Sequence, residues 1–248
     1  MVIFGSIIFT SCSKEQQYKN NSIATAHPLA SEAGNDMYIK GGNAADAAVA
    51  AAFTLSVVEP SMSGIGGRLQ AIVRLPNKEI RGIDASTQVP KNYDKKIKAN
   101  NYEKIGIPGT VAGLLEIHSK YGRLDLQTVM EPAINYAMNG FEILEGESIR
   151  QELAKNELIK NKQTAKYFLK NDSIPYDKGE KIIQKDLAKV LKKISTEGSK
   201  GFYEGEIAEK IEEDILANNG FITKEDLKNY KVINSKVLNG NYKGYKIA

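Results

Sequence analysis

The sequence predicts an α+β fold from three features. The segment NAADAAVAAAFTLSVVEP is so rich in alanine that no face carries much side-chain bulk, which favours a buried helix lying close against a sheet or another helix. The segments RLQAIVRL and EIRGIDAST flank the turn sequence PNK, and this arrangement predicts two strands joined as a hairpin. From Pro108 onward the apolar residues repeat mostly at helical spacing, so most of the remaining chain is expected to be helical.

Composition and charge are those of an ordinary globular protein of one large or two small domains. The 248 residues include 34 basic and 30 acidic ones, which gives a net charge of +4, and the two signs are interleaved along the chain. Such interleaving is typical of solvated helix faces, so no nucleic-acid partner is expected. The single cysteine excludes a disulfide within the chain and any CxxC metal site.

Residues 1–25 are expected to be a signal or lipoprotein segment followed by a polar tether. The run MVIFGSIIFTSC is apolar but too short to span a bilayer, and the polar SKEQQYKNNS follows it directly. FTSC resembles a bacterial lipobox, although Phe9 replaces the usual aliphatic residue and no Lys or Arg precedes the run. We therefore expect lipidation at Cys12 and a membrane-anchored protein of the cell envelope, periplasmic or on the outer surface. The alternative is an ordinary buried thiol at Cys12.

The first helices of the chain carry recognisable start and stop signals. HPLAS predicts a short strand, and a helix is expected over Glu32–Lys40, ended by Gly41 and Gly42 in the left-handed conformation. Asn43 is expected to cap the alanine-rich helix, with Asp46 as its partner in a capping box.

The glycines of PSMSGIGGRLQAIVRL raise the possibility of a phosphate-binding loop. Such loops run from a strand into a helix, whose N-terminus faces the anion. Here a helix precedes the glycines and a strand follows them, which argues against a nucleotide site. We instead expect Gly64, Gly66 and Gly67 to form a tight entry from the buried helix into the strand, at a place where backbone often approaches a ligand.

The second half of the chain is expected to be a helical lobe. GTVAGLLEIHSKYG predicts a helix closed by Gly122, and LQTVMEPAINYAMNG predicts two helical turns, a restart at Pro132 and a stop at Gly140. Further helices are expected at Ile183–Ile194 and Ile207–Ile215, and Thr223 and Asp226 suggest another capping box. The C-terminal VLNGNYKGYKIA predicts a strand pair around Asn239-Gly240 or a single bulged strand.

Residue chemistry alone indicates no active site. His27, in the predicted strand, and His118, on a helix, are expected to be structural histidines, and Thr110 is expected to cap a helix rather than to act as a nucleophile. HExxH, GxSxG, Walker and metal-ligand motifs do not occur, so neither a metal nor a cofactor is expected.

Five segments in order nevertheless resemble the γ-glutamyltranspeptidases, also called glutathione hydrolases. They are GGNAADAAVAAAFTLSVVEPSMSGIGG, IDASTQVP, GIPGTVAGLLEIHSKYG, PAINYAMNGFEI and GFYEGEIAEKIEEDILANNGFITKEDLKNYKV. The resemblance runs from about Ala26 to the last residue. It implies one partial large-subunit domain over residues 26–248, with strands and the buried helix to about 90, a mostly helical lobe over 100–230 and a returning strand over 232–248.

The family resemblance implies the N-terminal part of an N-terminal-nucleophile hydrolase, an αββα sandwich made as a self-cleaving precursor. In such enzymes a threonine freed at the new N-terminus attacks the γ-glutamyl amide, its own α-amino group serves as base, and the acyl group passes to water or to an amine. No TTH-like cleavage site occurs in this sequence. The nucleophile is therefore expected in the small-subunit half of the precursor, so no catalytic residue is assigned here and the isolated chain is expected to be inactive. The expected substrate is a small γ-glutamyl compound such as glutathione.

One departure from the family concerns the substrate α-carboxylate. The family's IDxR arginine, which clamps that carboxylate, corresponds to Ser86, and a hydroxyl cannot replace a guanidinium. Arg68, where the family has a further glycine, is expected to lie at the same end of the sheet, so Arg68 and Ser86 are the candidate substrate-binding residues. The alternative role for Arg68 is a surface salt bridge. Two further readings stay open: a related acylase with another acyl specificity, and a non-catalytic binding or structural chain.

Overall fold

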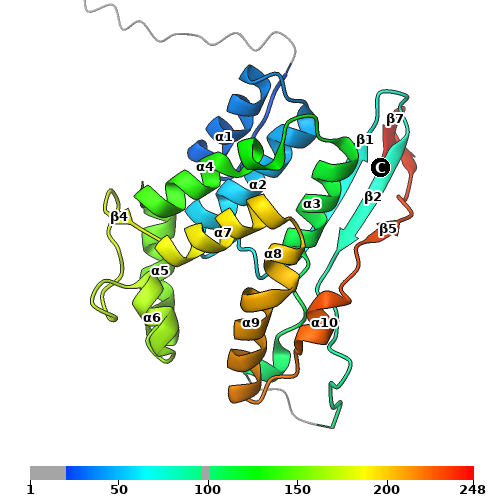
Figure 1. The fold of residues 1–248 in the computed structure, drawn as a ribbon. Coiled ribbons are helices and arrows are strands. Elements are labelled where there is room, and N and C mark those ends of the chain that lie inside the picture. Colours follow the sequence, from blue (N-terminus) through cyan, green and yellow to red (C-terminus); the bar gives the residue numbers. More distant parts are fainter. Residues whose placement is uncertain (1–20, 97–100) are drawn as a thin grey trace, which may run out of the picture.

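The computed structural model describes residues 21–96 and 101–248. Within these ranges the chain mixes helices with short antiparallel strands, so the predicted α+β class is confirmed (Figure 1). Cys12 and the rest of the expected leader lie outside the described residues, apart from the end of the tether. No helix in the described ranges is both long and apolar enough to cross a membrane.

The described elements are helices of 4 to 15 residues and strands of two to six residues. The helices are α1 Pro28–Ile39, α2 Ala44–Val58, α3 Thr110–Tyr121, α4 Leu126–Asn139, α5 Glu145–Leu158, α6 Lys162–Phe168, α7 Lys185–Glu197, α8 Lys200–Tyr203, α9 Gly205–Ala217 and α10 Lys224–Lys228, with a 3-10 turn at Tyr102–Lys104. The strands are β1 Leu69–Arg74, β2 Ile80–Ala85, β3 Phe141–Glu142, β4 Lys181–Ile182, β5 Ile233–Ser235, β6 Gly240–Tyr242 and β7 Tyr245–Ile247.

The alanine-rich helix α2 lies at the centre of the helical part, as its composition predicts. It packs against α1, α3 and α4, and α4 in turn packs against α7. Ala47, Ala50 and Phe53 are fully buried, and small side chains let the neighbouring backbones come close. The predicted capping box is confirmed: the side-chain oxygen Oδ1 of Asn43 accepts from Asp46 N at 3.2 Å, and Asn43 N donates to the Asp46 carboxylate at 2.8 Å.

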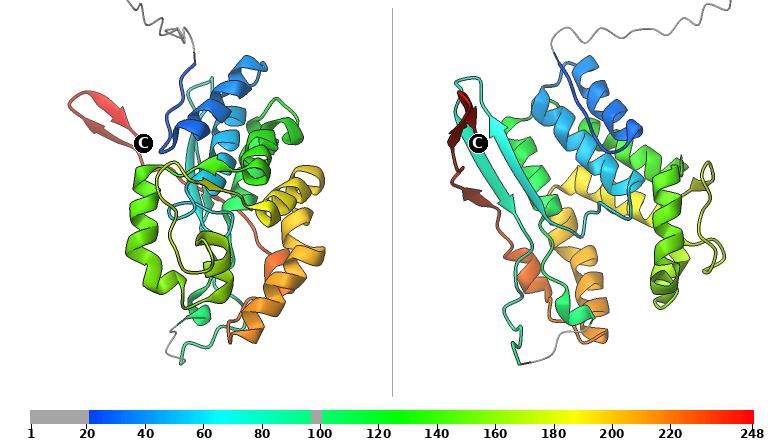
Figure 2. Two further views of the ribbon diagram at one scale, coloured as in Figure 1. Left: turned by 90° about the vertical axis from the view of Figure 1, so that its left-hand side faces the viewer. Right: turned by 180° about the vertical axis from the view of Figure 1, so that it is seen from behind.

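The main sheet has the order β1-β2-β5 and is antiparallel throughout. The predicted hairpin is confirmed, because β1 pairs with β2 from Leu69 opposite Ala85 to Arg74 opposite Ile80. α3 covers one face of this sheet, and the remaining helices lie on the same side, whereas the other face is bare (Figure 2). Ile72 and Ile233 lie on that bare face and are 57% and 55% exposed.

Close packing of α3 on the sheet requires a glycine at position 113. A Cβ added to Gly113 would lie 2.6 Å from both the Ala85 Cβ and the Leu69 Cδ2, so no larger residue fits without displacing the helix. The start of α3 therefore lies directly against the ends of β1 and β2, and this contact positions the site described below.

The predicted strand at HPLAS is wrong. Helix α1 begins at Pro28, whose missing N–H and fixed φ suit the first helical position, and His27 is its N-cap. The imidazole Nδ1 of His27 accepts from Leu29 N at 3.2 Å, so the ring replaces the usual serine or aspartate of a cap.

The predicted break at Pro132 is also wrong, because α4 runs unbroken from Leu126 to Asn139. Its apolar residues Val129, Met130, Ala133 and Ala137 are fully buried, and this packing offsets the one backbone hydrogen bond that proline removes.

The returning strand expected over 232–248 is two separate units. Only β5 joins the main sheet, whereas β6 and β7 form an independent hairpin that projects from the body (Figure 2). The hairpin turns at Lys243-Gly244 rather than at the predicted Asn239-Gly240. Lys243 and Gly244 both have positive φ, 47° and 83°, which is the geometry of a two-residue hairpin turn.

Candidate functional site

Two sequence motifs that lie far apart in the chain meet at one end of the main sheet. The carbonyl oxygen of Gly67, in the glycine-rich turn over residues 60–68 (the glycine turn), accepts from Gly109 N at 2.9 Å and from Thr110 N at 3.2 Å. These donors belong to the first turn of α3, where backbone N–H groups have no partner within the helix. The glycine turn is therefore attached to the N-terminus of α3.

The end of β2 also lies directly against the start of α3, because the backbone of Ala85 closely approaches Gly109. A Cβ added to Gly109 would clash with the Ala85 carbonyl oxygen and with the Tyr230 hydroxyl, and would lie 2.7 Å from the Ala85 carbonyl carbon. The Tyr230 hydroxyl donates to the carbonyl oxygen of Ser86 at 2.7 Å. Gly109 is thus required by contact rather than by its own backbone angles, since its φ is −111°.

A second tyrosine, Tyr203, contacts both the start of α3 and the ring of Tyr230. The Tyr203 hydroxyl donates to the Pro108 carbonyl oxygen at 2.8 Å and accepts from Ala112 N at 3.2 Å, and its ring stacks on that of Tyr230 with centroids 5.7 Å apart. Burial raises the pKa of Tyr203, so its hydroxyl keeps its proton and remains a donor. The start of α3 and the end of β2 are therefore joined through two stacked tyrosines.

Arg68 and Ser86 lie at the same end of the sheet, as expected from the hairpin. The last paired residues of the ladder are Leu69 and Ala85, and Arg68 and Ser86 are the next residues on their strands. The Ser86 hydroxyl lies 3.4 Å from Gln70 Nε2, and Ser86 N donates to the Asp84 carboxylate at 2.9 Å. Hydrogen bonds from the Ser86 side chain and backbone lower the pKa of Asp84, so that carboxylate is ionised near neutral pH.

A groove of about 610 Å³ lies between the glycine turn and α2. Its lining comes from α2, from the turn that leads to β1, and from Thr110; the residues are Ala52, Leu55, Ser56, Pro60, Ser61, Met62, Ser63, Gly64, Gly66, Gly67, Arg68, Leu69 and Thr110. Arg68 is exposed on its rim, and Ser86 is not part of the lining. Among the described residues Arg68 forms no ion pair, so the surface salt bridge considered as its alternative role is not observed.

The glycines of the turn are not explained by the described fold alone. Gly64, Gly66 and Gly67 do not have positive φ, and a Cβ at Gly64 or Gly66 would meet nothing within 4 Å. What the glycines do provide is an unobstructed backbone surface on the groove, which leaves room for a ligand to approach.

The model of the γ-glutamyltranspeptidase family matches residues 30–248. The chain belongs to the γ-glutamyltranspeptidase family.

Relatives and solved structures agree with this assignment. The chain is 39% identical over 225 residues to the capsule biosynthesis protein CapD proenzyme of Bacillus anthracis, covering 91% of this chain and 40% of that protein. It is 37% identical over 246 residues to the glutathione hydrolase proenzyme of Bacillus subtilis, covering 93% of this chain and 41% of that protein. The chain therefore spans about two fifths of the length of these relatives.

The crystal structure of Helicobacter pylori γ-glutamyltranspeptidase superposes on the chain with a TM-score of 0.86 at 40% identity, covering 92% of this chain and 70% of that one. The expected fold, the N-terminal part of an N-terminal-nucleophile hydrolase, is thereby confirmed, and the family resemblance found in the sequence is correct.

The two histidines and Thr110 have structural contacts. His118 Nε2 lies 2.9 Å from the Leu124 carbonyl oxygen, and His27 caps α1. Thr110 is the first residue of α3 rather than its cap, which is Gly109. Within the described ranges no group of three or more His, Cys, Asp or Glu side chains is arranged to hold a metal ion.

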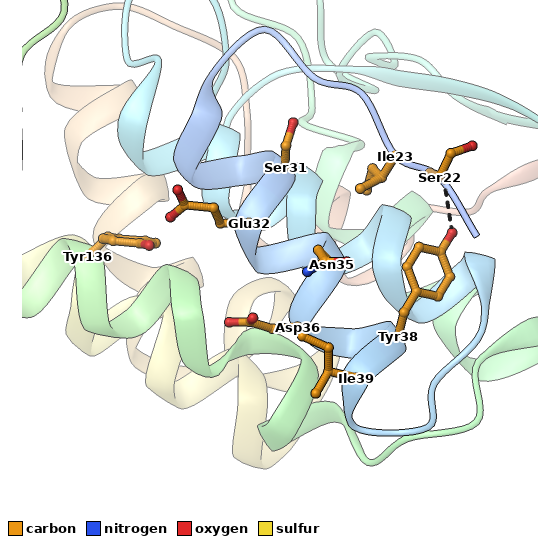
Figure 3. Close-up of a pocket in the computed structure, with 9 residues that line it drawn as sticks. All are labelled: Ser22, Ile23, Ser31, Glu32, Asn35, Asp36, Tyr38, Ile39 and Tyr136. Carbon is orange, nitrogen blue, oxygen red and sulfur yellow. Dashed lines mark hydrogen bonds between the residues drawn. The ribbon is translucent and has the colours of Figure 1, made fainter. Parts of the chain in front are cut away.

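The chain has a second hollow, of about 500 Å³, beside α1 (Figure 3). Glu32 and Asp36 project from successive turns of α1 toward the side on which Tyr136 lies, and Tyr38 donates to the Ser22 carbonyl oxygen at 3.4 Å. Burial, and then the charges of Glu32 and Asp36, raise the pKa of Tyr136. This hollow contains none of the residues of the glycine turn, so it is separate from the candidate site.

The sequence did not reveal a polar network beside the glycine turn. Glu59, at the end of α2, and Glu147, on α5, are 7% and 2% exposed, and both contact the guanidinium of Arg150. The sequence feature that could have indicated this network is Glu59 in VVEP, directly after the apolar run of α2. A charge in that place needs a partner when its helix is buried.

Proposed function

We propose that the chain is the large-subunit portion of a secreted γ-glutamyltransferase or glutathione hydrolase. Its substrates would be small γ-glutamyl amides such as glutathione, and its partner would be the small-subunit half of the same precursor. Family membership supports this proposal, and so does the similarity of the chain to a glutathione hydrolase proenzyme and to a γ-glutamyltranspeptidase.

The proposed chemistry divides between the two halves of the precursor. The N-terminal threonine of the small subunit attacks the γ-glutamyl carbonyl carbon, and its α-amino group takes the hydroxyl proton. The amide C–N bond then breaks, the leaving amine receives a proton, and the acyl-enzyme passes its acyl group to water or to an acceptor amine. This chain's part is to bind the substrate, and in particular to hold the negative end of the γ-glutamyl group.

The observation that carries the proposal is the position of Arg68. It is an exposed cation on the rim of a groove, it has no ion-pair partner within the described ranges, and the backbone around it is attached to the start of α3. A guanidinium in this position suits a carboxylate, which it can bind through two parallel hydrogen bonds. We therefore assign the substrate α-carboxylate to Arg68 in place of the family arginine that Ser86 replaces.

The test uses this chain produced together with a small-subunit segment of the family, and a γ-glutamyl anilide as substrate. Arg68→Ala is expected to weaken transition-state binding by about 1.5–3 kcal/mol, the value of a charged hydrogen bond, and this loss is measured as a fall in kcat/KM. Arg74→Ala is the matched control: Arg74 is an exposed arginine at the other end of β1 and lies outside the groove. An equal effect of the two substitutions would refute the role of Arg68.

The second candidate function is an acylase of the same superfamily with a different acyl group, which the replacement of the family arginine by Ser86 favours. Ser86→Arg distinguishes the two. An increase in γ-glutamyl activity would mean that Ser86 marks a loss of γ-glutamyl specificity rather than a transfer of the clamp to Arg68. Absence of any acyl transfer with either kind of substrate would favour a non-catalytic binding or structural chain.

We also propose that the protein is anchored to the cell envelope through lipidated Cys12, on the basis of FTSC after an apolar run. Cys12→Ala should then move the protein from the membrane fraction to the soluble periplasmic fraction. Unchanged partitioning with the membrane would exclude this anchor.

A further inference from the structure

The turn over residues 60–68, which we call the glycine turn segment, forms one wall of the groove and is attached at both ends. At its start the Glu59 carbonyl oxygen accepts from Met62 N at 2.9 Å and from Ser63 N at 2.8 Å. At its end Gly67 is bound to the start of α3. Between these points Ile65 packs against the hydrophobic core, and the Ser61 hydroxyl donates to Glu147 Oε1 at 2.7 Å.

The buried side chain of Glu147 is the centre of a polar network on α5. Its Oε1 also accepts from Gln151 Nε2 at 3.1 Å, and its Oε2 accepts from Arg150 Nη2 at 3.3 Å. The same Arg150 nitrogen donates to Glu59 Oε2 at 2.7 Å. Gln151 is held in turn, because its Oε1 accepts from Tyr176 N at 3.1 Å. Arg150 and Gln151 are thus each fixed by a second hydrogen bond, although Arg150 Nε is buried without a partner among the described residues.

Such a network is a poor source of stability. Two carboxylates share one guanidinium, and burial raises the pKa of Glu59 even though Arg150 acts in the opposite direction. Well-packed apolar residues generally serve stability as well as a buried ion pair does, whereas directional hydrogen bonds fix one geometry. The network connects a helix of the lobe with the wall of the groove, so the geometry that it fixes is that of the glycine turn segment.

We propose that Glu147 is a positioning residue, which acts through Ser61 to fix the glycine turn segment and thereby the place of Arg68 on the groove. Glu147 does not line the groove, so it would affect a ligand only through the segment. The link between Glu147 and the segment stands on the contacts above, whereas its effect on substrate rests on the proposed function.

Hydrogen exchange of the chain tests the link without any substrate. Ser61→Ala is expected to speed amide exchange over Met62–Gly67 about tenfold, the effect of losing one hydrogen bond to a charged group, and to leave exchange in α2 and α4 unchanged. Ser61→Thr keeps the hydroxyl and should restore the slow exchange. Thr128→Ala is the matched control, since the Thr128 hydroxyl also donates to a carboxylate at 2.7 Å, that of Asp125, but lies on α4 outside the groove.

The combination of Ser61→Ala with Glu147→Ala decides whether the two residues act together. If Glu147 acts through Ser61, the double variant exchanges over Met62–Gly67 no faster than Ser61→Ala alone. If the two effects multiply instead, Glu147 supports the segment by another route and the proposal is wrong. Glu147→Gln, which keeps an acceptor for Ser61 and most of the packing, replaces Glu147→Ala if the latter does not fold, and it should retain slow exchange.

Kinetics of the assembled enzyme with a γ-glutamyl anilide extend the test to function. Misplacement of Arg68 is expected to raise KM severalfold in Ser61→Ala and Glu147→Ala with kcat largely retained, and a fall in kcat alone would count against the proposal. Faster exchange in an enzyme without γ-glutamyl activity would leave the positioning link intact and refute the proposed substrate. Unaltered exchange together with normal activity would refute the positioning link and leave the proposed substrate intact.

Discussion

The Tyr230 hydroxyl donates to the carbonyl oxygen of Ser86 across 144 positions of sequence. This bond connects the segment after α10 with the end of β2, next to the glycine turn. Because Tyr230 also stacks on Tyr203, which binds the start of α3, one pair of aromatic rings holds the two sides of the candidate site at a fixed distance.

Tyr230→Phe removes this hydrogen bond and leaves the ring stacking in place. We expect the free energy of unfolding to fall by about 1 kcal/mol, the usual net value of a neutral hydrogen bond. Urea denaturation followed by circular dichroism measures the change. Tyr93→Phe is the control, since the Tyr93 ring contacts Phe221 while its hydroxyl has no hydrogen-bond partner among the described residues. Equal losses in the two variants would contradict the prediction.

Gly109→Ala is expected to be the most damaging small substitution at the site. The added Cβ would meet the Ala85 carbonyl and the Tyr230 hydroxyl, and the backbone on either side is tied to Gly67, so relief requires separating α3 from the sheet. Overpacking of this kind typically costs about 1–3 kcal/mol, and more where backbone must move. Gly64→Ala adds the same methyl group where nothing lies within 4 Å, and its melting temperature should match that of the unsubstituted chain.

His27 should make the chain sensitive to acid. Burial lowers its pKa from 6.5, with a smaller opposing effect of the Glu147 charge. The unfolded chain therefore binds a proton near pH 6.5, while the folded chain does so only at lower pH. Because the unfolded state then binds more protons just below pH 6.5, acidification favours unfolding in that range.

His27→Asn keeps a capping side chain for α1 and removes the titrating group. Denaturation at pH 7.5 and 5.5 should show a smaller loss of stability on acidification in this variant. His118→Gln serves as the matched histidine substitution and should retain the full loss. A loss that is the same in all three proteins would assign the acid sensitivity elsewhere.

The bare face of the main sheet should cause the isolated chain to associate. Ile72 and Ile233 are more than half exposed there, and the sheet has helices on its other face only (Figure 2). Light scattering is expected to show an apparent mass that rises with protein concentration, and Ile72→Lys should reduce this rise. Ile39→Lys changes an isoleucine on α1 that is 69% exposed and should have no such effect. A monodisperse monomer at high concentration would contradict the prediction.

Local signals in the sequence predicted the start of α2, the start of α10 and the β1–β2 hairpin. Each depends on residues within a few positions of one another: Asn43 with Asp46, Thr223 with Asp226, and two apolar runs around PNK. The strand predicted at HPLAS was wrong because an imidazole in the place of a usual cap residue carries no strong local preference, so the start of α1 was missed. Pro132 failed because the burial of α4 outweighs one lost hydrogen bond.

The candidate site was predicted only in part. The hairpin register placed Arg68 beside Ser86, which required nothing beyond the two strands. Gly109, Tyr203 and Tyr230 were not identified, because their roles depend on contacts between segments that are distant in the sequence. Glu59 and Glu147 were missed for the same reason. A buried carboxylate can be recognised in a sequence only when the partner that compensates its charge is known.

The pairing of β2 with β5 has a consequence for synthesis on the ribosome. Asp84 pairs with Ile233, so the outer edge of β2 stays open while about 150 further residues are translated, a period of about 8–30 s at common elongation rates. Throughout that time the nascent hairpin presents unpaired backbone donors and acceptors to any other strand nearby. On crowded polysomes this open edge can pair with a strand of a neighbouring nascent chain. Slower translation of residues 90–230 should therefore lower the yield of folded protein.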